Sequence, residues 1–143
     1  MNAKEFLLQI KQYDKLIENK LVEIQQWKDI ANNATSNLTG EKVESTPNPR
    51  KTEDAICKYL DLESEAKKDL DIFIKAKNDV INVIEQLSAT EYDLLHKVYV
   101  QFFTLKEAAY KCDISYTSAT NVHGRALKHV QNILDQREIK QSE

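Results

Sequence analysis

Glycine and proline are almost absent from this chain, and their scarcity limits what it can fold into. Among its 143 residues there are only two glycines, Gly40 and Gly124, and two prolines, Pro47 and Pro49. Phosphate-binding loops need several glycines within one turn, which excludes P-loop and dinucleotide-binding motifs. All-β folds need many tight turns built from the same residue types. With 30% charged and 41% hydrophobic residues, the composition is typical of long amphipathic helices, so we expect an all-α fold.

The N-terminal part predicts one long helix with a heptad seam. From Phe6 onwards, apolar residues recur in alternating steps of four and three, which is the a/d pattern of a coiled coil. The repeat is interrupted only at Lys20, where we expect Leu16 and Leu21 to flank the seam instead. The predicted seam consists of Phe6, Ile10, Tyr13, Ile17, Ile24, Trp27, Ala31 and Ala34.

A second long helix is expected after a polar stretch at about residues 35–54, which predicts a loop. Thr52 is its expected N-cap, because Glu53 and Asp54 follow where the helix dipole favours acidic residues. Its apolar stripe is wider than a two-stranded seam, so we expect more than one neighbour. The two helices fold most simply into an antiparallel hairpin, residues 1–89, although a bundle of several chains fits equally well. The stripe comprises Ile56, Tyr59, Leu60, Leu62, Ala66, Leu70, Phe73, Ile74, Val80, Ile81, Ile84 and Leu87.

Residues 90–138 predict a helical domain, followed by a tail at 139–143. Ser88 with Glu91, and Thr104 with Glu107, have the spacing of capping boxes, in which the acid reaches back to the capping residue. The first box is expected to begin a short helix with Leu94, Leu95, Val98, Tyr99 and Phe102 on its apolar face.

Residues 104–128 have the layout of a helix-turn-helix. Its first helix carries Ala108 and Ala109, small residues suited to a close crossing of two helices. In the turn, Asp113 replaces the usual glycine and tolerates the left-handed conformation better than most residues. Ser115 is expected to cap the second helix, which buries Ala119, Val122, Ala126, Leu127, Val130, Ile133 and Leu134.

A polar stripe lies on the opposite face of this second helix. Threonine and asparagine can donate to and accept from base edges, while lysine and arginine pair with phosphates. Gly124 costs about 1 kcal/mol relative to alanine inside a helix. It therefore suggests the close approach of a DNA backbone, with a neutral surface glycine as the alternative. The stripe comprises Thr117, Thr120, Asn121, Gly124 and Lys128, flanked by Tyr116 and Ser118.

Four features of the C-terminal part match a known family. They are the helix with Leu94, Leu95, Val98 and Tyr99, Thr-Leu-Lys-Glu-Ala-Ala at 104–109, Ile114-Ser115, and His-Gly-Arg-Ala-Leu at 123–127. On these features, residues 87–130 resemble region 4 of bacterial sigma factors. Together with the N-terminal helix MNAKEFLLQIKQYDKLIENK and Gly-Glu-Lys-Val at 40–43, the chain resembles small phage-encoded transcriptional regulators of the ArpU and RinA type.

The resemblance implies a sequence-specific DNA-binding regulator that activates late genes of a phage or prophage, in the cytoplasm of a bacterial host. The implied partners are double-stranded promoter DNA and host RNA polymerase, and the heptad stripes add a homo-oligomer formed through the hairpin. Ser115 would cap the recognition helix and anchor a phosphate. Tyr116, Thr117, Thr120 and Asn121 would face the major groove. Phosphates would be held by Arg125, Lys128 and Lys106, with Lys111 as a further candidate.

The sequence offers no motif for catalysis or cofactor binding. Serine, histidine and aspartate occur without a nucleophile elbow, and His123 and His129 are six residues apart, the wrong spacing for two ligands on one helical face. We expect His123 to be a surface residue, with a position near the DNA backbone as the alternative. Cys57 and Cys112 suggest neither a disulfide framework nor a zinc site, and the apolar runs are too short for a membrane span. We therefore expect no enzyme, no metal, no cofactor and no membrane partner.

Two other functions stay open. One is a small terminase-type DNA-packaging subunit, although such subunits usually carry their DNA-binding helices at the N-terminus. The other is a coiled-coil adaptor that does not bind DNA. The net charge of −3 comes from residues 1–89, whereas residues 104–134 hold four basic and two acidic residues. Because this basic surplus is small, we expect weak non-specific DNA binding, with dimerisation or polymerase supplying the rest.

Overall fold

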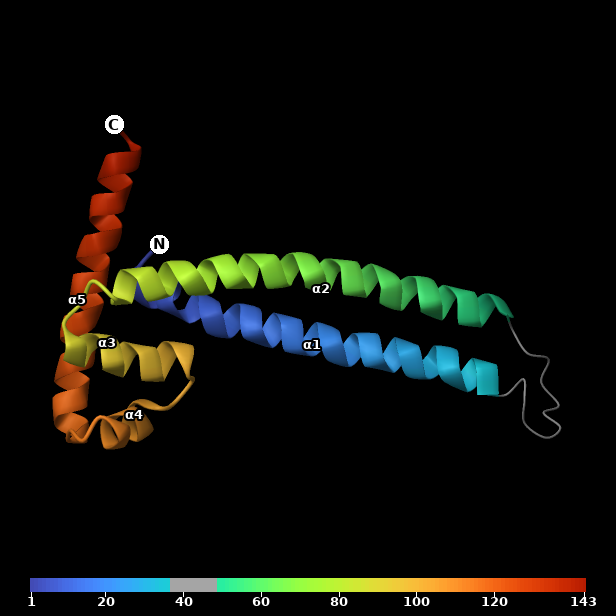
Figure 1. Cartoon of the computed structure of the whole chain (residues 1–143), viewed down its shortest axis with the longest axis horizontal. Helices are drawn as coiled ribbons and strands as arrows, with labels where there is room; N and C mark the ends of the chain where they lie inside the picture. Colours follow the sequence, from blue (N-terminus) through green and yellow to red (C-terminus); the bar gives the residue numbers. More distant parts are fainter. Residues whose placement is uncertain (37–48) are drawn as a thin grey trace. The chain divides into compact units, whose positions relative to one another are not determined.

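The computed structural model describes residues 1–36 and 49–143, and all regular structure within these ranges is helical (Figure 1). This confirms the all-α prediction. No helix in the described part of the chain is both long enough and apolar enough to cross a membrane. The helices are α1 (Ala3–Ser36), α2 (Pro49–Ile84), α3 (Ala89–Leu95), the π-helical η1 (His96–Val100), α4 (Leu105–Lys111) and α5 (Tyr116–Gln141).

Contacts within the chain gather into two units, and both long helices contribute to each. The C-terminal unit consists of Met1–Gln12 and Phe73–Glu143, and the paired-helix unit consists of Tyr13–Ile72. The predicted domains, 1–89 and 90–138, are divided where the heptad pattern of the sequence ends. The units instead place the first turns of α1 and the last turns of α2 with the C-terminal helices. That residues 90–138 form a domain of their own stays a prediction.

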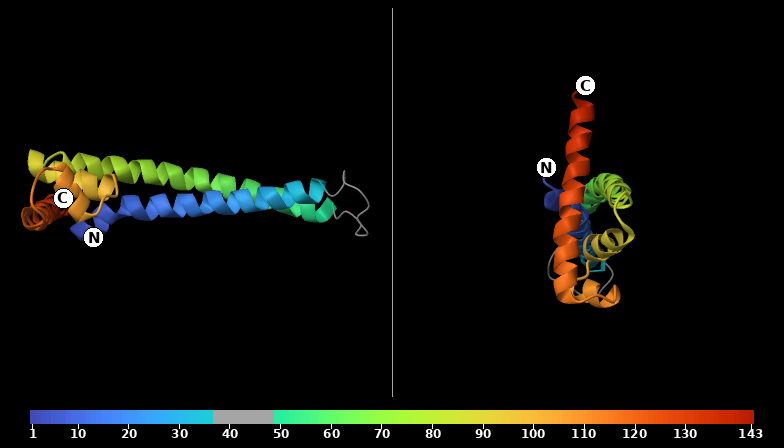
Figure 2. Two further views of the ribbon diagram at one scale, coloured as in Figure 1. Left: turned by 90° about the horizontal axis from the view of Figure 1, so that it is seen from below. Right: turned by 90° about the vertical axis from the view of Figure 1, so that its left-hand side faces the viewer.

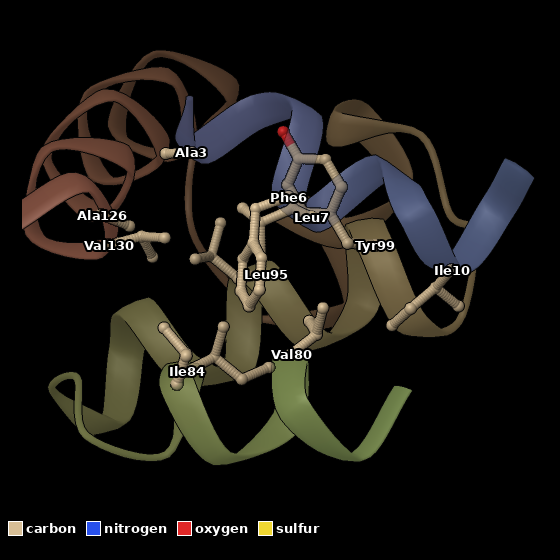
Figure 3. Close-up of a cluster of buried hydrophobic side chains, with 11 residues drawn as sticks. Ala3, Phe6, Leu7, Ile10, Val80, Ile84, Leu95, Tyr99, Ala126 and Val130 are labelled. Atoms are coloured by element: carbon tan, nitrogen blue, oxygen red, sulfur yellow. The ribbon is translucent and has the colours of Figure 1, made fainter. Parts of the chain in front are cut away.

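The main core of the C-terminal unit is built from every helix of that unit except α4 (Figure 3). Phe6, Leu7 and Ile10 of α1 are buried against side chains of the last turns of α2 and of α3, η1 and α5. A hydrogen bond also joins α1 to α5, since the Ala3 amide donates to Gln131 Oε1 at 2.7 Å. The core comprises Ala3, Phe6, Leu7, Ile10, Val80, Val83, Ile84, Leu95, Tyr99, Ala126 and Val130.

A second core lies where α3, α4 and the start of α5 meet (Figures 1 and 2). Ala108 and Ala109 of α4 are buried, and so is Ala119 of α5. Three alanines at one crossing allow the helix backbones to approach closely, as the sequence predicts. Leu94 of α3 and Val122 of α5 complete this core. The first turns of α5 are therefore held on one face by α3 and α4.

In the paired-helix unit, α1 and α2 contact each other in opposite order along the chain (Figures 1 and 2). Lys28 pairs with Glu63 at 2.8 Å, whereas Lys20 pairs with the later residue Asp69. The same two helices share an apolar core that comprises Ile24, Leu62 and Ala66, with Trp27 and Tyr59 packed beside it.

The expectation for Lys20 is wrong. Leu16 and Leu21 do not replace it beside the seam, because both are exposed. Lys20 itself stays in the repeat, since its ammonium reaches the carboxylates of Asp69 and Glu65 on α2. The hydrogen bond to Asp69 raises the pKa of Lys20. A charged residue keeps its heptad position here because the facing helix supplies the opposite charge.

The predicted boundaries of the central loop are also wrong. Helix α1 continues to Ser36 and α2 begins at Pro49, so Thr52 lies inside α2 rather than capping it. Proline is favoured in the first turn of a helix because it lacks an N–H that would otherwise have no partner there. Gly40 and the 40–43 motif lie outside the described residues.

Candidate nucleic-acid interface

The turn before α5 determines how this helix begins. Asp113 has a φ of 55°, the left-handed conformation expected at this position. The next amide, that of Ile114, donates to the Ala109 carbonyl at 3.1 Å and closes the end of α4. Ser115 then caps α5, since its Oγ accepts from the Ser118 amide at 3.1 Å. The predicted turn and cap are both confirmed, and so is the Thr104–Glu107 capping box of α4.

The predicted polar stripe of α5 is exposed along its whole length. Its opposite face is buried in the C-terminal unit through Ala119, Val122, Ala126 and Val130. This leaves the exposed polar face available to a partner. The Thr120 hydroxyl donates to the Tyr116 carbonyl at 2.9 Å, so its hydrogen is used within the helix. The exposed residues of this face are Thr117, Thr120, Asn121, Gly124 and Lys128.

Lys106 and Tyr116 come together although they belong to different helices. They line one hollow in the protein surface together with Thr104 and Leu105. The hollow lies where α4 and α5 both begin, and the Tyr116 side chain beside it is 58% exposed. Lys106, which is predicted to hold a phosphate, thus lies beside Tyr116, which is predicted to face the groove.

Arg125 has an intramolecular neighbour that the sequence did not reveal. Glu91 of α3 is the one charged side chain that is buried among residues 1–33 and 49–143, at 4% exposure. Its Oε2 lies 2.8 Å from Nδ1 of His129, and its Oε1 lies 3.7 Å from Nε of Arg125. A buried carboxylate needs such partners because leaving water is costly for a charge. Arg125 nevertheless keeps 60% of its side chain exposed.

The predicted capping box at Ser88 is therefore only half formed. Ser88 does cap α3, since its Oγ accepts from the Glu91 amide at 3.4 Å. The Glu91 carboxylate turns to α5 instead of reaching back to Ser88. The spacing of the two residues is the same in either case, so the sequence could not distinguish a cap from a contact between helices.

His123 is half-buried, which corrects the expectation of a surface histidine. Its Nε2 and the Oη of Tyr99 form a hydrogen bond of 2.7 Å, and the two rings stack at 16°. Burial, with a smaller effect of the Lys4 charge, lowers the pKa of His123 below 6.5. Burial also raises the pKa of Tyr99. This contact holds the N-terminal third of α5 against η1, and His123 is not part of the exposed polar stripe.

The lowered pKa of His123 predicts a loss of stability in mild acid. The unfolded chain takes up this proton near the ordinary pKa of 6.5, before the folded chain does. The contribution of His123 is therefore fully present above that pH and declines as the pH falls towards the lowered pKa. His96, whose pKa burial also lowers, acts in the same direction.

Urea unfolding at about pH 7.5 and about pH 5.5 measures this effect. We expect His123→Gln to lose less stability between these two conditions than the wild type. Equal losses in both proteins would contradict the assignment of a proton uptake to His123.

The two cysteines are free, Cys57 exposed and Cys112 half-buried. Cys112 Sγ donates to Asp93 Oδ2 at 3.3 Å, and Asp93 also accepts from Lys97. Burial raises the pKa of the Cys112 thiol. Within residues 1–36 and 49–143, no three His, Cys, Asp or Glu side chains gather in a way that could hold a metal ion.

The exposed face of α5, with Lys106 and Arg125 beside it, is thus the surface that the structure offers for an assignment of function. Compared with protein-family models, with curated proteins and with solved structures, the chain has no match in any of the three.

Proposed function

We propose that this chain is a sequence-specific DNA-binding transcriptional regulator, an activator of phage or prophage late genes. In this proposal α4 and α5 act as a helix-turn-helix, and the two long helices form an antiparallel hairpin. The observation that supports it best is the α5 face described above, polar and exposed, on a helix whose other face is fixed in a core. A recognition helix needs both properties, because it must enter a groove without losing its orientation.

The N-terminal half of α5 would lie in the major groove. There Tyr116, Thr117 and Thr120 would contact base edges, and the Asn121 amide could form a two-point contact with adenine. Gly124 fits the same arrangement, since no atom of the described chain outside its own helix lies within 4 Å of an added Cβ. Nothing in the described fold requires this glycine, whereas a DNA backbone close to it would.

Phosphates would be held around the edge of this face. The N-terminus of α5 at Ser115 presents backbone N–H groups and the positive end of the helix dipole. Lys106 and Lys128 lie to either side along the surface, and both are exposed. Arg125 can bridge its neighbour Glu91 and a phosphate, since its guanidinium has several donors and its Nε lies 3.7 Å from Glu91 Oε1.

The proposal includes two protein partners. Contact with host RNA polymerase rests on the sigma-factor resemblance. A homo-oligomer through the hairpin rests on the heptad stripes, and it would let two modules bind repeated half-sites. Additional contacts are needed, because two surplus positive charges between residues 104 and 134 give only a weak hold on phosphates.

Selection from a random duplex library, followed by fluorescence anisotropy, tests the proposal. We expect one sequence family to emerge, bound at least about 10³-fold more tightly than random duplex. Failure to select any sequence would refute sequence-specific binding and favour the adaptor. Ring-like assemblies that bind DNA without preference would favour the terminase-type subunit.

Lys128→Ala separates backbone contacts from base reading. Removing one phosphate contact should weaken binding to selected and random duplexes alike. It should also reduce the slope of log K against log salt by about 0.9. Anisotropy titrations at four salt concentrations measure both effects.

Lys140→Ala is the matched control, since Lys140 is exposed in the last turn of the same helix, far along it from Lys128. An equal loss in both variants would show that only net charge matters.

A further inference from the structure

Helix α2 carries a second apolar stripe, most of which is exposed in the described chain. Leu60, Leu70 and Ile74 are 51%, 42% and 47% exposed. They follow a helical repeat of their own, distinct from the one that buries Leu62 and Ala66 against α1. Exposed leucine and isoleucine at a regular spacing on one helix face indicate an interface.

The spacing along this stripe reads the same in both directions, and so do the residue types, except that the acid and the base at its centre exchange places. In steps of four, three, four, three and four residues it runs through Ile56, Leu60, Glu63, Lys67, Leu70 and Ile74. Apolar residues occupy the two ends, and one acidic and one basic residue occupy the middle. An identical helix laid antiparallel would place Leu60 opposite Leu70 of the second copy and Glu63 opposite Lys67 of the second copy.

We propose that a second copy of this chain covers the stripe, with its α2 antiparallel to the first and the two-fold axis near residue 65. A two-fold interface requires a surface that is complementary to itself. This stripe meets the requirement, since leucine faces leucine in two layers and the charges pair twice. A parallel arrangement in register would place Glu63 against Glu63 and Lys67 against Lys67 of the second copy, and repulsion disfavours it.

The steps along the stripe also suit coiled-coil packing. Alternating steps of three and four give the 3.5-residue average of a left-handed coiled coil. In an antiparallel coiled coil, each layer of the interface contains one residue from each helix. One of the two is three residues before the next interface residue of its own helix, and the other is four residues before it. Pairing Leu60 with Leu70 of the second copy satisfies this rule, and so does pairing Glu63 with Lys67 of the second copy.

The paired-helix unit supplies flanking contacts for the same interface. Lys28 of α1 reaches Glu63, which lies within the stripe. Leu21 lies seven residues before Lys28, and Leu70 lies seven residues after Glu63. Because α1 and α2 run in opposite directions, Leu21 is expected beside Leu70, one heptad away from the contact between Lys28 and Glu63. Leu21 is 56% exposed and would extend the apolar area. Lys28 approaches Glu63 Oε1, which leaves Oε2 to accept from Lys67 of the second copy.

This inference gives a geometry to the homo-oligomer in the proposed function, and its test needs no DNA. Sedimentation equilibrium of the full chain should show a dimer at micromolar concentration. Lys67→Glu places a glutamate opposite Glu63 of the other copy in both halves of the interface. We therefore expect a dissociation constant at least about tenfold higher. Lys68→Glu, with the same charge change one residue off the stripe, should leave the dimer unchanged.

A mixing experiment tests the antiparallel register directly. Glu63→Lys and Lys67→Glu should each be weakly dimeric alone. Mixed in equal amounts, they should form a heterodimer, because both charge pairs are then restored. Native mass spectrometry distinguishes the three species when one variant is uniformly labelled with the heavy nitrogen isotope.

A monomeric wild type, equal effects of Lys67→Glu and Lys68→Glu, or no heterodimer in the mixture would each overturn the proposed interface. Circular dichroism of each variant confirms that helix content is retained. Selection of a DNA sequence by a monomeric chain would refute this dimer without refuting DNA recognition.

Discussion

Replacing Leu7 by alanine is expected to lower the free energy of unfolding of the C-terminal unit by about 3 kcal/mol. The Leu7 side chain is fully buried in the core that also holds Leu95 and Val130. The substitution removes three heavy atoms from this packed site, and the cavity left behind adds to the lost transfer free energy. Urea unfolding and hydrogen exchange of the α5 amides measure the loss. Exchange of the most protected amides should accelerate about 100-fold.

Leu16→Ala is the matched control, because the same helix carries Leu16 at 42% exposure. We expect it to cost less than about 1 kcal/mol, since little apolar surface returns to water. The pair tests the unit boundaries, because Leu7 lies in the predicted hairpin by sequence but in the C-terminal unit by contact. Similar small losses in both variants, with α5 exchange unchanged, would show that the start of α1 does not stabilise α5.

Features that depend on neighbouring residues could be predicted from the sequence. The Thr104–Glu107 capping box, the Ser115 cap and the left-handed Asp113 are all present as expected. Each is decided within one turn of chain, where residue type and spacing determine the hydrogen bonds. Periodicity also identified the helices, since a repeat near 3.6 residues has few alternatives in a chain so poor in glycine and proline.

Features that depend on a partner from elsewhere in the chain could not be predicted. Glu91 has the right spacing for a capping box, and only the approach of His129 on α5 makes it a buried hydrogen-bond partner instead. Lys20 interrupts an apolar repeat, and only Asp69 on α2 explains why it stays in place. Phe102, expected on a helix, lies beyond η1 with a φ of 65°, a conformation that bulky side chains avoid. The exceptions at Glu91 and Lys20 are set by tertiary contact.

The candidate site follows the same division. Exposure of Thr117, Thr120 and Asn121 could be inferred from the apolar residues on the other side of α5, because one repeat fixes both faces. The position of Lys106 beside Tyr116 required the fold, since they lie on separate helices. The Glu91 carboxylate near Arg125 also required it. The surroundings of the residues proposed to hold phosphates were therefore harder to predict than the exposure of the proposed groove face.

Asn121→Ala is expected to reduce sequence preference while leaving the fold intact. The Asn121 side chain is exposed, so its loss removes no core packing. A two-point amide contact with adenine is worth about 1–3 kcal/mol of discrimination. Binding to the selected duplex should weaken roughly ten- to a hundredfold, and binding to random duplex should not change. Competition anisotropy at one fixed salt concentration measures the two affinities together.

Asn132→Ala supplies the control for this experiment, as Asn132 is exposed on the same helix beyond the proposed groove face. It should leave both affinities unchanged. Thr120→Ala should have a smaller effect than Asn121→Ala, because the Thr120 hydroxyl already donates its hydrogen to the Tyr116 carbonyl and can only accept from a base. If Asn132→Ala weakened specific binding more than Asn121→Ala, the groove face would lie further along α5 and the assignment of residues 116–121 would be wrong. If Thr120→Ala had the larger effect, the helix would be rotated so that its hydroxyl, rather than the Asn121 amide, reads the base edge.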